Sequence, residues 1–451
     1  MKKAAMLNDS TATRWTMLIL VAFLMFGVYF VSDVLSPLKT MLERDLFWDS
    51  RDFGLFSGSY SLFNVALFML IFGGLMLDKM GIRFSGITSG IVMIVGIGIK
   101  YWAMTNDALV GQAIFGMKAQ VVYMVLGFGI FGVGAEVAGI TVSKAIAKWF
   151  NGKEMALAMG MQLAIARLGS ALALSVSPII AESFGKVSTP VLFGLALLLI
   201  GLISFIIYTF FDKKLDKQIS DAADVKEESF KLSDVKVILN NKGFWLIAFL
   251  CLVFYSAVFP FLKFASDLMV NQFSVDPKLA GLIPSLLPFG CILLTPLFGT
   301  LYDRIGHGAD LMIIGAIMLT TVHILFATPF TTSWVVAIIL MIILGIAFAL
   351  VPSAMWPSVV KIIPSKQLGT AYSLIFYIQN IGLLLMPIGI GYVLDTFCRN
   401  ETGTGAAYDY TIPMVIFAAV SSIAIVLAFL LKREDKIKGY GLQEANMQKA
   451  K

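Results

Sequence analysis

Long apolar runs separated by short polar loops dominate this chain of 451 residues. A run of about 20 mostly apolar residues is long enough to cross the hydrocarbon core of a bilayer as a helix. We count twelve such runs, so the pattern predicts an all-α membrane protein with 12 transmembrane helices. Their approximate limits are 15–36, 53–77, 84–105, 119–147, 154–180, 187–211, 243–265, 279–302, 309–328, 333–357, 367–394 and 411–431.

The one long polar segment falls between the sixth and seventh runs, at 212–242, and is rich in Lys, Asp and Glu. It predicts a cytoplasmic linker between an N-terminal six-helix bundle at 1–211 and a C-terminal six-helix bundle with a short cytoplasmic tail at 243–451. Lys and Arg concentrate in the loops on the same side as the two termini. The positive-inside rule therefore predicts that both termini are cytoplasmic.

A repeated loop supports the division into two halves. The chain reads GGLMLDKMGIR at 73–83 and FGTLYDRIGHG at 298–308, so Asp78 and Asp303 are 225 positions apart (303 − 78). Such duplication is typical of transporters built from repeats. We expect the loop glycines to make tight turns, and the charged residues of both copies to bias an inward/outward equilibrium. A tight, positively charged loop without a switching role is the alternative. The charged residues in question are Asp78, Lys79, Arg83, Asp303 and Arg304.

Composition agrees with a membrane protein and excludes several other classes. Charged residues make up 14% of the chain, against about 25% in soluble domains. The net charge of +6 is explained by basic residues in the cytoplasmic loops, which can contact membrane lipid. It does not indicate nucleic-acid binding. The three cysteines and two histidines form no disulfide framework, metal site or cofactor site. We find no nucleotide-binding loop and no nucleophile–base pair, so we do not expect an enzyme.

Two charges lie deep inside apolar runs, Glu136 before the basic connector 144–153 and Arg167 after it. At roughly 1.5 Å per residue, both lie about 17–20 Å from the same membrane face, near the middle of a ~30 Å hydrocarbon core. Charges at that depth are costly and usually mark a substrate or ion path. The alternative interpretation is a permanent structural ion pair that locks the two helices together. In the functional interpretation, the two residues are expected to pair with each other in the empty state, until substrate replaces one partner.

Other polar residues reach a similar depth and are candidate partners for a substrate's polar groups. Each of them alone is better explained by hydrogen bonding between helices. Asp33 lies nearer the outer face, where it is expected to act as an outer gate, to attract a cationic group, or to cap a broken helix before Pro37. Lys263 is expected to extend to the interface. The other polar candidates are Tyr29, Asn64, Tyr255, Gln379 and Asn380.

The repeated loop resembles the signature G-x-L-x-D-[KR]-x-G-x-[KR] of the major facilitator superfamily. This resemblance implies two six-helix bundles around a central cavity, with alternating access. Further stretches resemble the lysosomal dipeptide transporter family. They are Tyr29-Phe30 with Asp33, Asn64, Gly132 to Glu136, Lys148 to Phe150, Gly152 to Glu154, Ala166 to Ser170, Val258 to Phe261, Trp356-Pro357, Gly369 to Tyr372, and Gln379-Asn380.

That second resemblance implies a small-peptide cargo with Glu136 and Arg167 at the site. A dipeptide is a zwitterion, and an acid suits its ammonium while a guanidinium grips its carboxylate with two parallel bonds. The alternative cargo is a small organic or inorganic anion held by Arg167. Nitrate porters use arginines in helices 2 and 8, and the runs 53–77 and 279–302 contain none.

Several properties stay open at this stage. The residues do not decide between uniport and proton symport, and the resemblance favours uniport. The expected location is the plasma (inner) membrane in a prokaryote or the lysosomal membrane in an animal. The accessory subunit known in the lysosomal family is not predicted from these residues. A non-transporting receptor on the same fold is a further alternative, which the buried charges disfavour.

Overall fold

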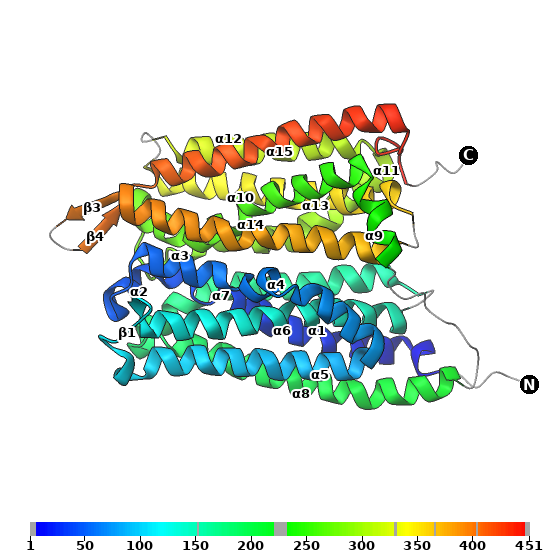
Figure 1. Cartoon of the computed structure of the whole chain (residues 1–451), viewed down its shortest axis with the longest axis horizontal. Coiled ribbons are helices and arrows are strands. Elements are labelled where there is room, and N and C mark those ends of the chain that lie inside the picture. The colour runs from blue at the N-terminus through cyan, green and yellow to red at the C-terminus, as the bar shows by residue number, and fades with distance from the viewer. Residues whose placement is uncertain are drawn as a thin grey trace, which may run out of the picture.

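A computed structural model gives the structure for residues 6–150, 153–220, 232–328, 332–364, 367–402 and 405–446. The first half of the chain is helical (Figure 1). Its described part contains no strand apart from those of one short hairpin. Its helices are η1 (Leu7–Asp9), α1 (Thr11–Asp33), η2 (Ser36–Leu38), α2 (Lys39–Leu46), α3 (Ser50–Ser59), α4 (Leu62–Ala66), α5 (Met69–Thr105), η3 (Asp107–Leu109), α6 (Ala119–Trp149), α7 (Met155–Phe184) and α8 (Thr189–Ser220).

The second half repeats this organisation. Its helices are α9 (Leu232–Leu239), α10 (Lys242–Phe273), α11 (Leu282–Ile305), α12 (Gly308–Phe326), α13 (Trp334–Ile362), α14 (Leu368–Phe397) and α15 (Thr411–Lys438). Each half also carries one small antiparallel hairpin. The hairpins pair β1 (Ala113–Ile114) with β2 (Met117–Lys118), and β3 (Arg399–Thr402) with β4 (Gly405–Tyr408).

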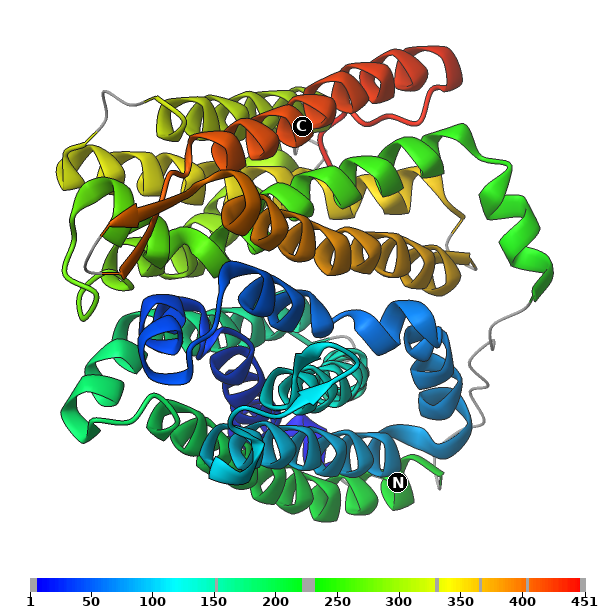
Figure 2. The same ribbon diagram turned by 60° about the vertical axis from the view of Figure 1, so that its left-hand side comes forward.

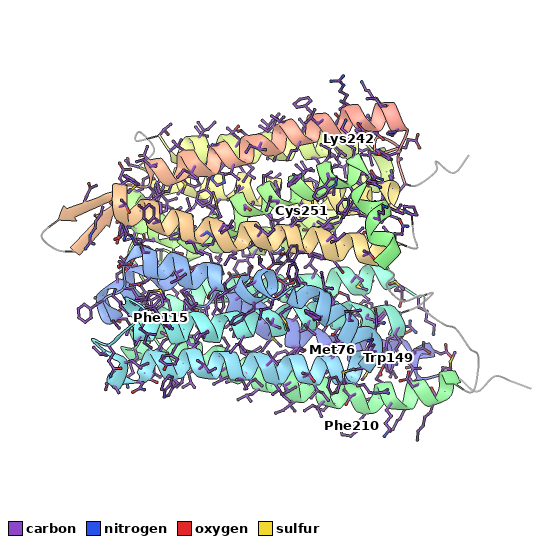
Figure 3. All side chains as sticks on the ribbon, viewed as in Figure 1. Met76, Phe115, Trp149, Phe210, Lys242 and Cys251 are labelled. Atoms are coloured by element: carbon purple, nitrogen blue, oxygen red, sulfur yellow. The ribbon has the colours of Figure 1, made fainter. Side chains whose placement is uncertain are left out.

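The helices pack into two bundles that lie side by side (Figures 1 and 2). In the N-terminal bundle, α5 packs on α6, and α1 packs on α7 and α8. In the C-terminal bundle, α12 packs on α13 and α15, and α10 packs on α14 and α15. Side chains fill the interior of both bundles (Figure 3). Because a helix satisfies its own backbone hydrogen bonds, this architecture suits a hydrocarbon environment. The predicted fold of two six-helix bundles is confirmed.

The two ends of the bundles differ in the segments that they carry. The hairpin end carries the β1–β2 and β3–β4 hairpins, and the terminal end carries the described chain ends at Met6 and Asn446 (Figure 1). Among the described residues, eleven helices are long and apolar enough to cross a membrane. The predicted helix 53–77 is the exception, because it is interrupted.

The interruption divides this helix into α3, α4 and the start of α5. The chain leaves the α-helical pattern around Tyr60–Ser61, and Phe68 takes a left-handed conformation with φ 53°. Gly132 of α6 permits the close approach, because a Cβ there would lie 1.9 Å from the carbonyl oxygen of Tyr60. The apolar pattern shows no sign of this break, and its effect is to aim the Tyr60 side chain between the bundles.

The repeated loop forms the tight turn that its glycines predict. Gly81, with φ 80°, is the one non-helical residue inside α5 and separates the second and third predicted spans. Gly306, with φ 71°, ends α11 just before α12 begins. Glycine lacks the Cβ that makes such dihedral angles costly for other residues. The expectation for both turns is therefore confirmed.

The bundles touch closely at the hairpin end, where α3 meets α14. A Cβ on Gly54 would lie 2.4 Å from the Pro387 carbonyl oxygen, and a Cβ on Gly391 would lie 2.3 Å from that of Ser50. Helix α11 also packs on α7, and α10 packs on η2 and α2. The expected linker 212–242 begins inside a helix, since α8 continues to Ser220 and Asp212 is 1% exposed. Its residues 221–231 lie outside the described residues.

Candidate functional site

A cavity of about 420 Å³ lies between the two bundles. Helices α1, α3, α6 and α7 line it from the N-terminal bundle, and α10, α11, α13 and α14 line it from the C-terminal bundle. Its volume falls in the range of about 300–1,000 Å³ that is usual for small-molecule sites. Most of the lining is apolar or aromatic, so the few charged side chains in it decide what it can bind.

Four charged side chains line the cavity, and two of them form an ion pair. Lys263 on α10 contacts Asp33 at the end of α1, with Nζ 2.6 Å from Oδ1. Ser170 donates to the other oxygen of Asp33 at 2.5 Å, and Lys263 also donates to the Ser32 carbonyl at 2.7 Å. This pair joins the bundles and compensates both of its charges. The prediction that Lys263 extends to the interface is wrong, since it turns inward to Asp33.

The other two charges, Glu136 on α6 and Arg167 on α7, do not pair with each other. Glu136 accepts a hydrogen bond from the Tyr60 hydroxyl at 3.1 Å. The Arg167 guanidinium lies over three aromatic rings, 4.9 Å from the centroid of Phe348 and 5.5 Å from those of Phe259 and Tyr29. Within the described chain no ion pair involves either residue. The expected empty-state ion pair between them is therefore absent from this conformation.

Three of the predicted uncharged residues line the cavity with polar groups available. The Tyr255 oxygen accepts from Trp356 Nε1 at 3.1 Å, which leaves its own O–H free to donate. Gln379 accepts from Cys251 Sγ at 3.4 Å through its oxygen, and its amide nitrogen has no partner in the described chain. The Tyr29 ring covers Arg167, and its hydroxyl likewise makes no hydrogen bond to the described residues.

The two predicted asparagines are committed to contacts between helices. Asn380 borders the cavity but is 1% exposed, and it accepts from the Ser61 hydroxyl of the other bundle at 2.7 Å. Asn64 is fully buried outside the cavity lining and donates to the Gly132 carbonyl at 3.2 Å. The structure therefore does not bring Asn64 to the site, because the break in the second span turns α4 against α6.

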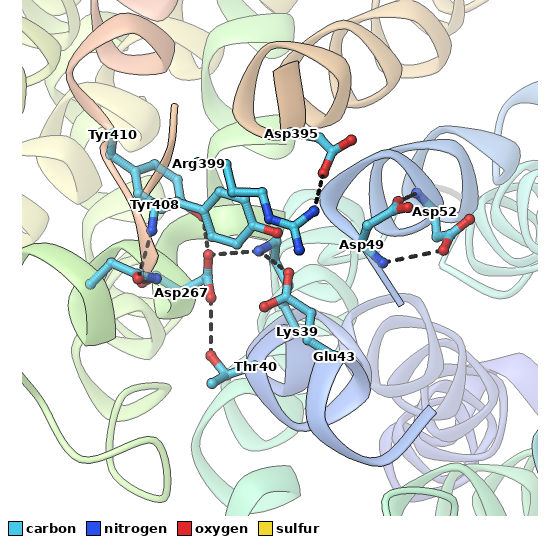
Figure 4. A network of polar contacts seen from close by, with 11 residues as sticks. Lys39, Thr40, Glu43, Asp49, Asp52, Asp267, Asp395, Arg399, Tyr408 and Tyr410 are labelled. Carbon is cyan, nitrogen blue, oxygen red and sulfur yellow. Dashed lines mark hydrogen bonds and ion pairs between the residues drawn. The ribbon is translucent and has the colours of Figure 1, made fainter. Parts of the chain in front are cut away.

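A second inter-bundle network lies at the hairpin end (Figure 4). Lys39 on α2 contacts Glu43 at 2.6 Å and Asp267 of α10 at 2.9 Å. Thr40 donates to Asp267 at 3.0 Å, and so does the Tyr410 hydroxyl. The Lys39 ammonium also lies 4.1 Å from the Tyr408 ring centroid. Sequence reasoning missed this network, because Lys39 and Asp267 lie at the ends of apolar runs and look like interfacial charges.

The charged residues of the repeated loop lie at the terminal end and contact their own bundle. Asp78 pairs with Lys144 at 3.1 Å. Arg83 pairs with Asp212 at 3.0 Å and with Asp216 at 2.5 Å. In the second copy, Asp303 accepts from Asn446 of the C-terminal segment at 2.7 Å. Lys79 and Arg304 are exposed.

The ion pairs between the bundles show which end of the protein is closed in this conformation. Every ion pair between the bundles that joins two described residues lies toward the hairpin end: Asp33–Lys263, Lys39–Asp267 and Arg51–Asp395. Among the described residues, each ion pair at the terminal end joins two residues of the same bundle. The structure is therefore closed at the hairpin end by contacts that must separate if that end is to open.

This fold, with a charged cavity between two repeated six-helix bundles, defines an integral multi-pass membrane transporter. The model of the Major Facilitator Superfamily matches residues 21–387 and 264–448. The chain therefore belongs to the Major Facilitator Superfamily, and both fold and family are those expected from the sequence. This is a family of transporters rather than of enzymes.

Within the superfamily, the chain is similar to lysosomal dipeptide transporters. It is 30% identical to the lysosomal dipeptide transporter MFSD1 of Danio rerio, over 95% of this chain and 88% of the relative. It is 28% identical to the protein of that name from Homo sapiens, over 97% and 90% of the two chains. A mutant of the nucleoside transporter NupG, solved as a crystal structure, shares the fold with a TM-score of 0.71 at 15% identity, over 92% of this chain and 99% of that one.

Proposed function

We propose that this protein transports dipeptides across a membrane by alternating access. One observation carries the proposal: a single cavity is lined by an acid and a base that do not neutralise each other. Glu136 has only a neutral hydroxyl partner and Arg167 only aromatic rings within the described chain. Burying two uncompensated charges is costly unless a ligand of matching charges completes the site.

A zwitterion with separated termini fits that requirement. Its ammonium pairs with Glu136, and its carboxylate takes two parallel hydrogen bonds from the Arg167 guanidinium. The free donors of Tyr29, Tyr255 and Gln379 suit the carbonyl oxygens of the ligand. The similarity to lysosomal dipeptide transporters supports the same cargo class.

The transport cycle follows from which contacts are closed. We infer that the terminal end faces the cytoplasm, because the basic loops concentrate there. The halves 1–211 and 243–451 would then move about the segment 212–242. The loop residues Asp78, Lys79, Arg83, Asp303 and Arg304 are proposed to bias the opposite state, in which the terminal end is closed. Asp33 with Lys263 is proposed to act as part of the hairpin-end gate.

Direct binding to the purified protein tests the proposal. The panel contains a neutral dipeptide, its two constituent amino acids, lactate and nitrate, each measured by isothermal titration calorimetry. We expect the dipeptide to bind the parent, and to bind both Glu136→Gln and Arg167→Ala measurably but more weakly. Binding of lactate or nitrate without the dipeptide would instead favour an anion transporter that uses Arg167 alone.

A conservative substitution of Arg167 tests whether this residue binds the carboxylate of the dipeptide. Arg167→Lys keeps the positive charge but loses the two parallel bonds, and a hydrogen bond to a charged group contributes about 1.5–3 kcal/mol. We therefore expect the dipeptide to bind about tenfold or more weakly to this variant. Unchanged affinity would show that Arg167 does not grip a carboxylate.

A further inference from the structure

The C-terminal bundle presents a continuous set of aromatic rings to the cavity, which we call the aromatic wall. It consists of Tyr255, Phe259, Phe348, Trp356 and Phe376. Successive ring centroids lie 5.4 Å apart for Phe348 and Phe259, 5.4 Å for Phe259 and Tyr255, 6.5 Å for Tyr255 and Trp356, and 5.0 Å for Trp356 and Phe376. The wall comes from three helices, α10, α13 and α14.

The aromatic wall and the two uncompensated charges belong to different bundles. Glu136 and Arg167 both come from the N-terminal bundle, and Glu136 hydrogen-bonds Tyr60 of that same bundle. Of these two residues, only Arg167 extends to the C-terminal bundle, where its guanidinium lies over Phe259 and Phe348 of the aromatic wall. The site is therefore asymmetric, because its basic end contacts the wall while its acidic end is held by the opposite bundle.

This asymmetry orients a dipeptide in the cavity. In a dipeptide the carboxylate and the side chain of the C-terminal residue are attached to the same carbon atom. A carboxylate held by Arg167 therefore places that side chain beside Phe259 and Phe348. The side chain of the N-terminal residue lies one peptide unit further along, toward Glu136 and Tyr60.

We propose that the aromatic wall recognises the C-terminal side chain of the dipeptide and favours aromatic and aliphatic side chains there over acidic ones. Aromatic rings bury apolar surface and pair with one another at centroid distances of about 4.5–7 Å. Their negative faces repel a carboxylate. This inference rests on the proposed dipeptide transport and adds the property that selects among dipeptides.

The test compares variants against a set of matched peptides. Phe259→Leu and Phe348→Leu keep an apolar side chain but remove a ring of the aromatic wall. Each variant and the parent are titrated with Gly-Gly, Gly-Phe, Phe-Gly and Gly-Glu. We expect the preference for Gly-Phe over Gly-Gly to fall about tenfold in at least one variant, with Phe-Gly changing little relative to Gly-Gly. In the parent, Gly-Glu should bind more weakly than Gly-Phe.

Ratios between peptides separate side-chain recognition from the positioning of Arg167. If the rings only hold the guanidinium, all four peptides lose affinity equally, and the proposal is overturned. A larger loss for Phe-Gly than for Gly-Phe would reverse the orientation and overturn it as well. If the parent binds none of the four peptides, the proposed function itself fails, which is a distinct outcome.

A matched control guards against loss of folding. Phe249 lies on α10 like Phe259, but this residue is 42% exposed and is not part of the cavity lining. Phe249→Leu should leave the ratios among the four peptides unchanged. The thermal unfolding midpoint of every ligand-free variant is measured alongside, and a second readout comes from uptake of the same peptides into proteoliposomes.

Discussion

Removing the Lys39 ammonium should open the hairpin end of the protein. Lys39 is completely buried and bridges two carboxylates, Glu43 of its own helix and Asp267 of the other bundle. In Lys39→Met, both carboxylates stay buried without their cation as long as the hairpin end is closed. Once that end opens, water can solvate them. The substitution therefore penalises the closed state and not the open one.

The size of the shift in the open/closed equilibrium follows from the burial of the ion pair. Removing one partner of a buried ion pair costs about 3–5 kcal/mol. Since about 1.4 kcal/mol corresponds to a factor of ten, the open/closed equilibrium constant should rise by roughly two to three and a half orders of magnitude. Asp267→Asn should have a smaller effect, because Lys39 would keep Glu43 at 2.6 Å.

Distances between spin labels at the hairpin end measure this shift. Labels on Phe115→Cys and Lys278→Cys report on the two bundles from exposed positions. The native cysteines Cys251, Cys291 and Cys398 are first replaced. We expect a population with a longer distance between the labels in Lys39→Met, and a smaller such population in Asp267→Asn.

Lys118→Met serves as the matched control for this experiment. Lys118 is also a hairpin-end lysine, but its acidic partners Asp49 and Asp52 belong to its own bundle. Its removal should leave the distance distribution unchanged. If Lys39→Met also leaves that distribution unchanged while the protein remains folded, the network stabilises the fold and does not hold the hairpin end closed.

Three further predictions concern the terminal end. Gly306→Ala should lower the thermal unfolding midpoint by several degrees, because its φ is +71° and a Cβ would lie 2.4 Å from the Gln443 carbonyl oxygen; an unchanged midpoint would contradict this packing. Asp212→Asn should destabilise the protein by about 3–5 kcal/mol, and Asp216→Asn by about 1 kcal/mol or less, because the two side chains are 2% and 42% exposed; equal losses in denaturant unfolding would refute the difference. Asp78→Asn should change stability by at most about 1 kcal/mol but shift the spin-label distances, and identical distances would argue against a switching role.

The sequence predicts the fold well, because lipid imposes simple rules. Spans must be apolar and about 20 residues long, and the repeated loop locates the same turn in both halves. The sequence also indicates both uncompensated charges of the cavity, since Glu136 and Arg167 interrupt otherwise apolar runs. These signals are local, and they can be recognised without knowing which helices are neighbours.

The features that the sequence does not reveal depend on contacts between distant segments. Lys263 finds Asp33 230 positions away, and Lys39 finds Asp267 228 positions away. Two of the three rings that cover Arg167, those of Phe259 and Phe348, look like ordinary apolar residues of their own helices. Tyr60 becomes a partner of Glu136 only because the second span breaks, and the same break removes Asn64 from the site.

Capped dipeptides test directly whether Glu136 and Arg167 bind the two ends of the ligand, because each cap removes one of its charges. Calorimetry compares a free dipeptide, its N-acetylated form and its C-terminal amide on the parent, Glu136→Gln and Arg167→Ala. Acetylation should weaken binding at least tenfold in the parent and little in Glu136→Gln. Amidation should weaken binding at least tenfold in the parent and little in Arg167→Ala. Equal penalties for each cap in the parent and in the variants would show that these two residues do not bind the ends of a dipeptide.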